Sequence, residues 1–199
     1  MKKLLFVLLI AMSLTVNGQS SMGIWGNVVN TEDGTRLELS SRKETGGGYN
    51  LQITCRYYNL TIGENTFLAL TIPSSKVATF KNEWRQIQSK YNEWLRTAKA
   101  NKVQEVEKDI PVQITSVSDM YGGSMTYPEK KSIKAVFFIY NSVPHCIIKS
   151  AISGYNIYQQ CEWLLTANDF PKILSEIDRT IEHQRNYDSD KKKTEELFH

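Results

Sequence analysis

A long stripe of apolar and aromatic side chains in the middle of the sequence constrains the fold more than any other feature. Its members recur at alternating steps of three and four: Val77, Phe80, Trp84, Ile87, Tyr91, Trp94 and Ala98. This spacing places them on one side of an α-helix that Ser74 or Ser75 can cap. A partner chain or the protein's own sheet can cover the stripe. Because predicted strands surround it, we expect the helix to pack on the chain's own sheet, with Lys81, Glu83 and Arg85 in water.

Short alternating segments precede this helix and predict antiparallel strands. Residues 24–29 and 37–39 flank Glu32-Asp33-Gly34, a turn sequence that is typical of a hairpin. A second turn is expected at Gly46-Gly47-Gly48. After it, one face of a strand carries Leu51, Ile53, Cys55 and Tyr57, and the other face is polar. Such alternation indicates one buried and one solvated face. Residues 66–72 predict a further strand that is apolar on both faces.

The second half of the chain repeats the order of strands and then a helix. Strands are expected over 110–117, 133–140, 145–152 and 155–165, the last two joined by a hairpin turn at Ser153-Gly154. Asn168 or Asp169 caps a closing helix. Its buried stripe is Phe170, Ile173, Leu174, Ile177 and Ile181. We therefore expect an α+β fold, ordered strands, helix, strands, helix, whose two helices pack on antiparallel sheet. The repeated order suggests two related halves.

The first 18 residues have the features of a removable signal peptide. Lys2 and Lys3 form a basic region, residues 4–12 are apolar, and Val16-Asn17-Gly18 supplies the small residues that a signal peptidase reads. The apolar run is shorter than the roughly 20 residues that cross a bilayer. We expect export to the periplasm or the cell exterior after removal of 1–18. A single α+β domain over 19–186 and a charged flexible tail over 187–199 would follow.

Composition and charge exclude several classes of protein. Of the 199 residues, 41% are hydrophobic and 23% are charged, which is ordinary globular usage and excludes wholesale disorder. Removal of the two signal lysines lowers the formal net charge from +3 to +1. A nearly neutral chain lacks the broad basic surface that nucleic acids need. We therefore expect no nucleic-acid partner and, after signal removal, no membrane span.

The histidines and cysteines show no spacing that is typical of a metal site. They lie at positions 145, 183 and 199 and at positions 55, 146 and 161, without a C-x-x-C or H-E-x-x-H pattern. The glycine clusters lack the residues of a phosphate-binding or dinucleotide-binding loop. We expect no metal and no cofactor.

The predicted hairpin at Ser153-Gly154 brings two pairs of residues together. A two-residue turn places His145 opposite Glu162, and a carboxylate beside an imidazole can support acid–base chemistry. The same register places Cys146 opposite Cys161, which predicts a disulfide and leaves Cys55 as a free thiol. The alternatives are a solvated charge pair and three reduced, buried cysteines.

Tyrosines near strand ends and loops suggest recognition of a ligand. The segment 118–131 carries Met120, Tyr121, Met125 and Tyr127 beside two glycines and is the expected contact surface. The alternative is that such rings only cover sheet edges. We expect an exported soluble binding or interaction protein that takes a protein, a peptide or a glycan. The other hypotheses are a small envelope hydrolase that uses His145 and Glu162, and an inhibitor or structural component of an envelope complex.

Overall fold

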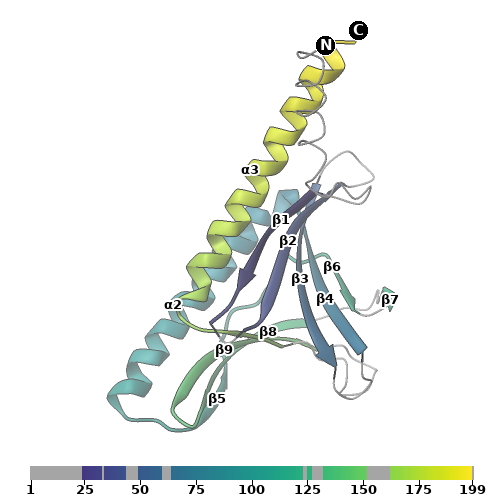
Figure 1. Cartoon of the computed structure of the whole chain (residues 1–199). Helices are drawn as coiled ribbons and strands as arrows, with labels where there is room; N and C mark the ends of the chain where they lie inside the picture. The colour runs from purple at the N-terminus through teal and green to yellow at the C-terminus, as the bar shows by residue number, and fades with distance from the viewer. Residues whose placement is uncertain are drawn as a thin grey trace, which may run out of the picture.

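Two antiparallel sheets and two long helices make up most of the described chain (Figure 1), which confirms the predicted α+β class. The computed structural model describes residues 24–32, 34–43, 49–59, 64–122, 125–126, 132–151 and 162–198. The first sheet has the order β1-β2-β3-β4-β6-β7: β1 Ile24–Asn30, β2 Arg36–Lys43, β3 Tyr49–Asn59, β4 Glu64–Pro73, β6 Asp119–Gly122 and β7 Met125–Thr126. The second has the order β10-β9-β8-β5: β10 Glu162–Leu165, β9 Val143–Ala151, β8 Ser132–Tyr140 and β5 Val106–Asp109. Helix α2 spans Val77–Ala100 and helix α3 spans Asp169–Glu196.

The strands before α2 form where the alternating pattern predicts them. A turn joins β1 to β2, and its Gly34 has a φ of 91°, a left-handed conformation that glycine adopts without strain. Leu51, Ile53 and Cys55 on β3 are buried, as predicted, but Thr54 on the face expected in water is buried as well. The expected turn at Gly46-Gly47-Gly48 lies outside the described residues.

The stripe of α2 is internal, as predicted. Its members Val77, Phe80, Trp84, Ile87, Tyr91 and Ala98 are buried, and Trp94 is partly buried against the same core. The ring of Trp84 lies 5.6 Å from that of Phe80 and 5.5 Å from that of Phe170 on α3. The ring of Tyr91 lies 5.5 Å from that of Phe137 on β8. The stripe thus joins the second sheet and α3 in one core.

Two details of α2 differ from the prediction. Glu83 is buried rather than solvated, because its carboxylate accepts hydrogen bonds from the Thr115 backbone (2.9 Å), the Thr115 hydroxyl (2.7 Å) and the Ser116 hydroxyl (2.5 Å). The serines do not cap the helix: residues 74–76 form a 3-10 turn, and α2 begins after it without a side-chain cap.

Helix α3 follows the strands of the second sheet in sequence but lies against β1, β2 and β3 of the first sheet (Figure 1). Its predicted stripe packs on the core: Phe170, Ile173 and Ile177 are fully buried, and Leu174 and Ile181 are partly buried. Each helix therefore contacts strands of the sheet from the other half of the chain, since α2 also contacts β8.

The start of α3 is held by a polar cluster rather than by a cap. Asn168 precedes the helix but makes no capping bond, and its amide donates to Glu32 (2.8 Å). Asp169 is fully buried and accepts from the Thr166 backbone (2.8 Å) and from Lys172 (3.2 Å). Hydrogen bonds from Asn168 and Thr166 lower the pKa of Glu32. The cluster fastens the β1–β2 turn to α3.

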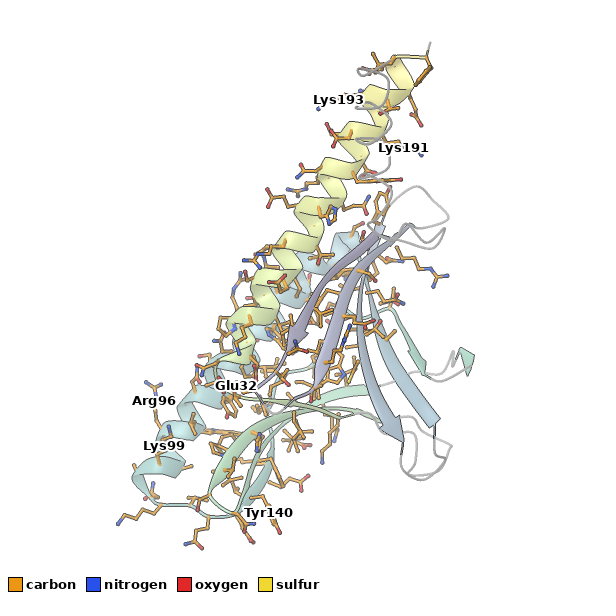
Figure 2. The ribbon with its side chains drawn as sticks, viewed as in Figure 1. Glu32, Arg96, Lys99, Tyr140, Lys191 and Lys193 are labelled. Carbon is orange, nitrogen blue, oxygen red and sulfur yellow. The ribbon has the colours of Figure 1, made fainter. Side chains whose placement is uncertain are left out.

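The end of the chain is helical over much of the predicted tail. Helix α3 continues to Glu196, and its exposed last turns carry pairs such as Lys191 with Glu195 (3.8 Å). Figure 2 shows Lys191 and Lys193 on the part of α3 that extends past the strands. Residues 189–198 are exposed, but Tyr187 and Asp188 are half-buried, and the helix is longer than its apolar stripe indicated.

The strand predicted over 110–117 is displaced. The structure has β5 at Val106–Asp109, and residues 110–118 leave the sheet and run toward β6. Pro111 has no N–H for a ladder, and the N–H of Val112 turns back to the carbonyl of Ile110 (2.7 Å). Helix α2 then holds the segment through Glu83.

Candidate functional site

A groove of about 790 Å³ opens where α3, the start of α2 and the β2–β3 end of the first sheet meet. Apolar side chains in its lining are Leu51, Val77, Ala78 and Ile181. Its polar and charged lining consists of Ser41, Tyr49, Asn50, Ser74, Lys81, Asp178, Thr180, Glu182, Gln184, Arg185 and Asp188. An apolar surface with a few convergent polar groups is the usual composition of a ligand site.

The polar wall of the groove arises from a change of residue type along one face of α3. Phe170, Ile173 and Ile177 occupy that face first, and the same three-and-four spacing continues with Thr180, Gln184 and Asp188. Thr180 and Gln184 are 2% and 6% exposed. The face therefore stays turned toward the sheet while its chemistry changes from apolar to polar.

A chain of hydrogen bonds connects this polar face to the sheet. The Ser41 hydroxyl donates to Oε1 of Gln184, and Nε2 of Gln184 donates to Oδ1 of Asp188 (3.1 Å). The Tyr49 hydroxyl donates to the same oxygen (2.7 Å). Ser41 and Tyr49 flank the connection between β2 and β3, so the hairpin and the helix hold Asp188 from two sides.

Asp188 also keeps the Tyr49 phenol protonated. Its hydrogen bond with Tyr49, together with burial and the negative charge of the carboxylate, raises the pKa of Tyr49 to about 12. The phenol is therefore a fixed donor at neutral pH. Both donors that reach Asp188 bind Oδ1, and Oδ2 accepts no hydrogen bond from the described residues.

Asn50, the neighbour of Tyr49 on β3, also belongs to the groove lining. Its Oδ1 is buried and has no hydrogen-bond partner within the described part of the chain. Leaving a buried acceptor without a donor costs about 1–3 kcal/mol. At the other end of the groove, Lys81 forms an ion pair with Asp178, which ties α2 to α3.

The predicted contact surface lies elsewhere in the fold. Met120 and Tyr121 are on β6, paired with Leu70 and Ala69 of β4, and Met125 is on β7. The side chains of these three residues are outside the described part of the structure, and so is all of Tyr127. The backbone thus forms the edge of the first sheet, away from the groove lining.

The predicted pairing of His145 with Glu162 is wrong. Glu162 on β10 lies opposite Lys149, four residues from the predicted partner, and His145 lies opposite Phe138. Nδ1 of His145 is buried without a described hydrogen-bond partner. A shift of an even number of residues keeps every side chain on its face of the sheet, so alternation alone did not distinguish the two registers.

The same register shift removes the argument for a disulfide between Cys146 and Cys161. Leu165 lies opposite Cys146, whose thiol is free and buried. Burial raises the pKa of Cys146 well above its ordinary value. Cys55 is buried as well, on β3. Cys161 lies outside the described residues.

No group of three or more histidine, cysteine, aspartate or glutamate side chains within the described ranges is placed to hold a metal ion. Over those same ranges, neither helix combines the length and the apolar character that a bilayer span requires. Comparisons of the chain with protein-family models, curated proteins and solved structures find no match.

Proposed function

We propose that this chain is an exported binding protein whose ligand occupies the groove between α3, α2 and the β2–β3 end of the first sheet. The observation that carries the proposal is the groove itself. Its volume of about 790 Å³ lies in the range of roughly 300–1,000 Å³ that is typical of small-molecule sites. Its polar groups converge from three elements that are far apart in sequence.

The chemistry of the lining favours binding over catalysis. Among the described residues, the groove lining includes no histidine and no cysteine, which are the usual general base and the usual activated thiol. The hydrolase hypothesis depended on a register that placed His145 beside Glu162, and that register is wrong. Export is supported by the basic, apolar and small-residue segments within residues 1–18.

A groove-blocking variant tests the proposed site. Ala78 is exposed and lines the groove, so Ala78→Trp fills the space with an indole ring. The matched control is Ala100→Trp, because Ala100 is exposed at the far end of the same helix. In ligand-observed NMR with a fragment library, we expect Ala78→Trp to abolish most hits and Ala100→Trp to keep them. Hits that survive Ala78→Trp would place binding outside the groove.

Mass spectrometry of the protein from its native host tests export. The proposal expects a mature chain that begins near Gln19. A retained Met1 on a cytoplasmic product would contradict it.

A further inference from the structure

The chemistry of the groove indicates which class of ligand it takes. This inference rests on the proposed function, and it begins with the hydrogen-bonding groups that the protein leaves open. The hydroxyls of Ser41 and Tyr49 and one N–H of Gln184 are already used within the wall. Among the described residues, none donates a hydrogen bond to Oδ2 of Asp188.

Asp188 is held so that one of its oxygens stays available. Tyr49 and Gln184 both donate to Oδ1 and fix the orientation of the carboxylate. A group oriented before binding loses less conformational entropy when a ligand arrives. Asp188 therefore offers a fixed anionic acceptor rather than a freely rotating one.

Among the described side chains that line the groove, acidic residues outnumber basic ones. They comprise Asp178, Glu182 and Asp188 against Lys81 and Arg185. Lys81 is paired with Asp178, which leaves Glu182 and Asp188 against Arg185. The charge balance therefore favours a cation over an anion.

The rest of the lining supplies an apolar surface. Leu51 and Val77 are buried and expose almost no area, whereas Ala78 is exposed and Ile181 is partly buried, so these last two present apolar surface to the groove. These side chains suit an apolar stem, because apolar area removed from water stabilises a complex by about 25 cal/mol per Å² before the costs of association.

We propose that the groove binds a small organic cation, a primary amine or a guanidinium carried on an apolar stem. The cationic head donates to Oδ2 of Asp188, and the stem covers Ala78 and Ile181. The ligand thereby supplies a donor to the carboxylate oxygen that accepts no hydrogen bond from the described residues.

Three probes with one apolar body and different heads test the charge preference: benzylammonium, benzyl alcohol and benzoate. They are titrated into the isotopically labelled mature chain and followed by protein NMR. We expect benzylammonium to bind at least about tenfold more tightly than the other two, with shifts at Ser41, Leu51 and Gln184. Equal or tighter binding of benzoate at these residues would overturn the cation assignment and leave the groove as a site.

The failure of the site itself has a different signature. If none of the three probes shifts the resonances of the groove residues, the groove is not a ligand site and the proposed function fails with the inference. A fourth probe, the tripeptide Ala-Lys-Ala with blocked ends, separates a free amine from a peptide side chain. Tighter binding of this peptide than of benzylammonium would overturn the small-molecule part of the proposal.

Variants on α3 test whether the carboxylate of Asp188 contacts the cationic head of the ligand. Asp188→Asn keeps an oxygen that can accept from Tyr49 and Gln184 and removes the negative charge. The matched control is Asp190→Asn, because Asp190 is exposed two residues further along the helix and outside the groove lining. We expect about a tenfold loss of benzylammonium affinity in Asp188→Asn and less than about a twofold change in Asp190→Asn. Equal effects of the two changes would show only a general charge effect and would contradict a contact with Asp188.

Discussion

Helices α2 and α3 bury one face each, but they use that face differently. The buried face of α2 is apolar along most of its length, and its exception, Glu83, is fully used in fastening the 110–118 segment. The fully buried positions of α3 are apolar from Phe170 to Ile177 and polar at Thr180 and Gln184, with Ile181 partly buried beside them. The difference separates a region that holds the fold together from one that lines the groove.

The largest loss of stability is expected when the apolar contact between the two helices is removed. Trp84→Ala and Phe170→Ala should each reduce the free energy of unfolding by about 3–5 kcal/mol, because both side chains are buried and their rings lie 5.5 Å apart. Urea denaturation measures the loss. Arg85→Ala, on the exposed side of α2, is the control and should cost less than about 0.5 kcal/mol. Similar small losses in all three would mean that the stripes are not internal.

A smaller loss of stability is expected when a polar residue on the buried face of α3 is removed. Gln184→Ala removes the acceptor for Ser41 and one donor to Asp188, and it should cost about 1–2 kcal/mol because the adjoining groove admits water. The same denaturation experiment measures it. A loss as large as that of Phe170→Ala would show that this part of α3 is core and would break the contrast between the helices.

The ionisation of Tyr49 tests the polar end without removing a core side chain. Its pKa is raised from 10.0 to about 12, so the fold favours the protonated phenol. This stabilising contribution is complete below pH 10 and is lost as the pH rises from 10 to 12. Ultraviolet titration of the phenolate, compared with Tyr49→Phe, should locate the transition. Asp188→Asn should lower the pKa of Tyr49 toward 10, and an unchanged pKa would contradict the contact.

The smallest change in stability is expected when the last turns of α3 are deleted. Residues 190–198 are exposed and bind mainly one another through pairs such as Lys192 with Glu196 (3.9 Å). Deleting residues 190–199 should change the free energy of unfolding by less than about 0.5 kcal/mol. Calorimetry of the truncated chain measures it, and a large loss would extend the stabilising role of α3 beyond Asp188.

The fold class could be predicted because periodic apolar spacing reports which side of each element is buried. Periodic apolar spacing was enough to predict the buried stripes of α2 and α3 and the buried face of β3. It could not fix the register of β9 and β10, because a shift of four residues leaves the alternation unchanged. Periodic spacing also predicted that Glu83 is solvated. The donors that hold Glu83 in a buried position, Thr115 and Ser116, lie more than thirty positions away and leave no local pattern.

The groove could not be predicted from local patterns. Ser41 and Gln184 are 143 positions apart, and Tyr49 and Asp188 are 139 positions apart. One local signal was present: Thr180, Gln184 and Asp188 continue the spacing of the apolar stripe of α3 with polar residues. Polar residues on an otherwise buried face break a local rule, and such breaks concentrate at functional sites.

The buried face of α3 turns from core to groove wall between Ile177 and Gln184. Nuclear Overhauser contacts in the labelled chain test this change most directly. We expect contacts from the side-chain amide of Gln184 to the ring of Tyr49 and to Ser41, together with contacts between the rings of Phe170 and Trp84. Contacts between Phe170 and Trp84 with the Gln184 amide free in solvent would contradict it.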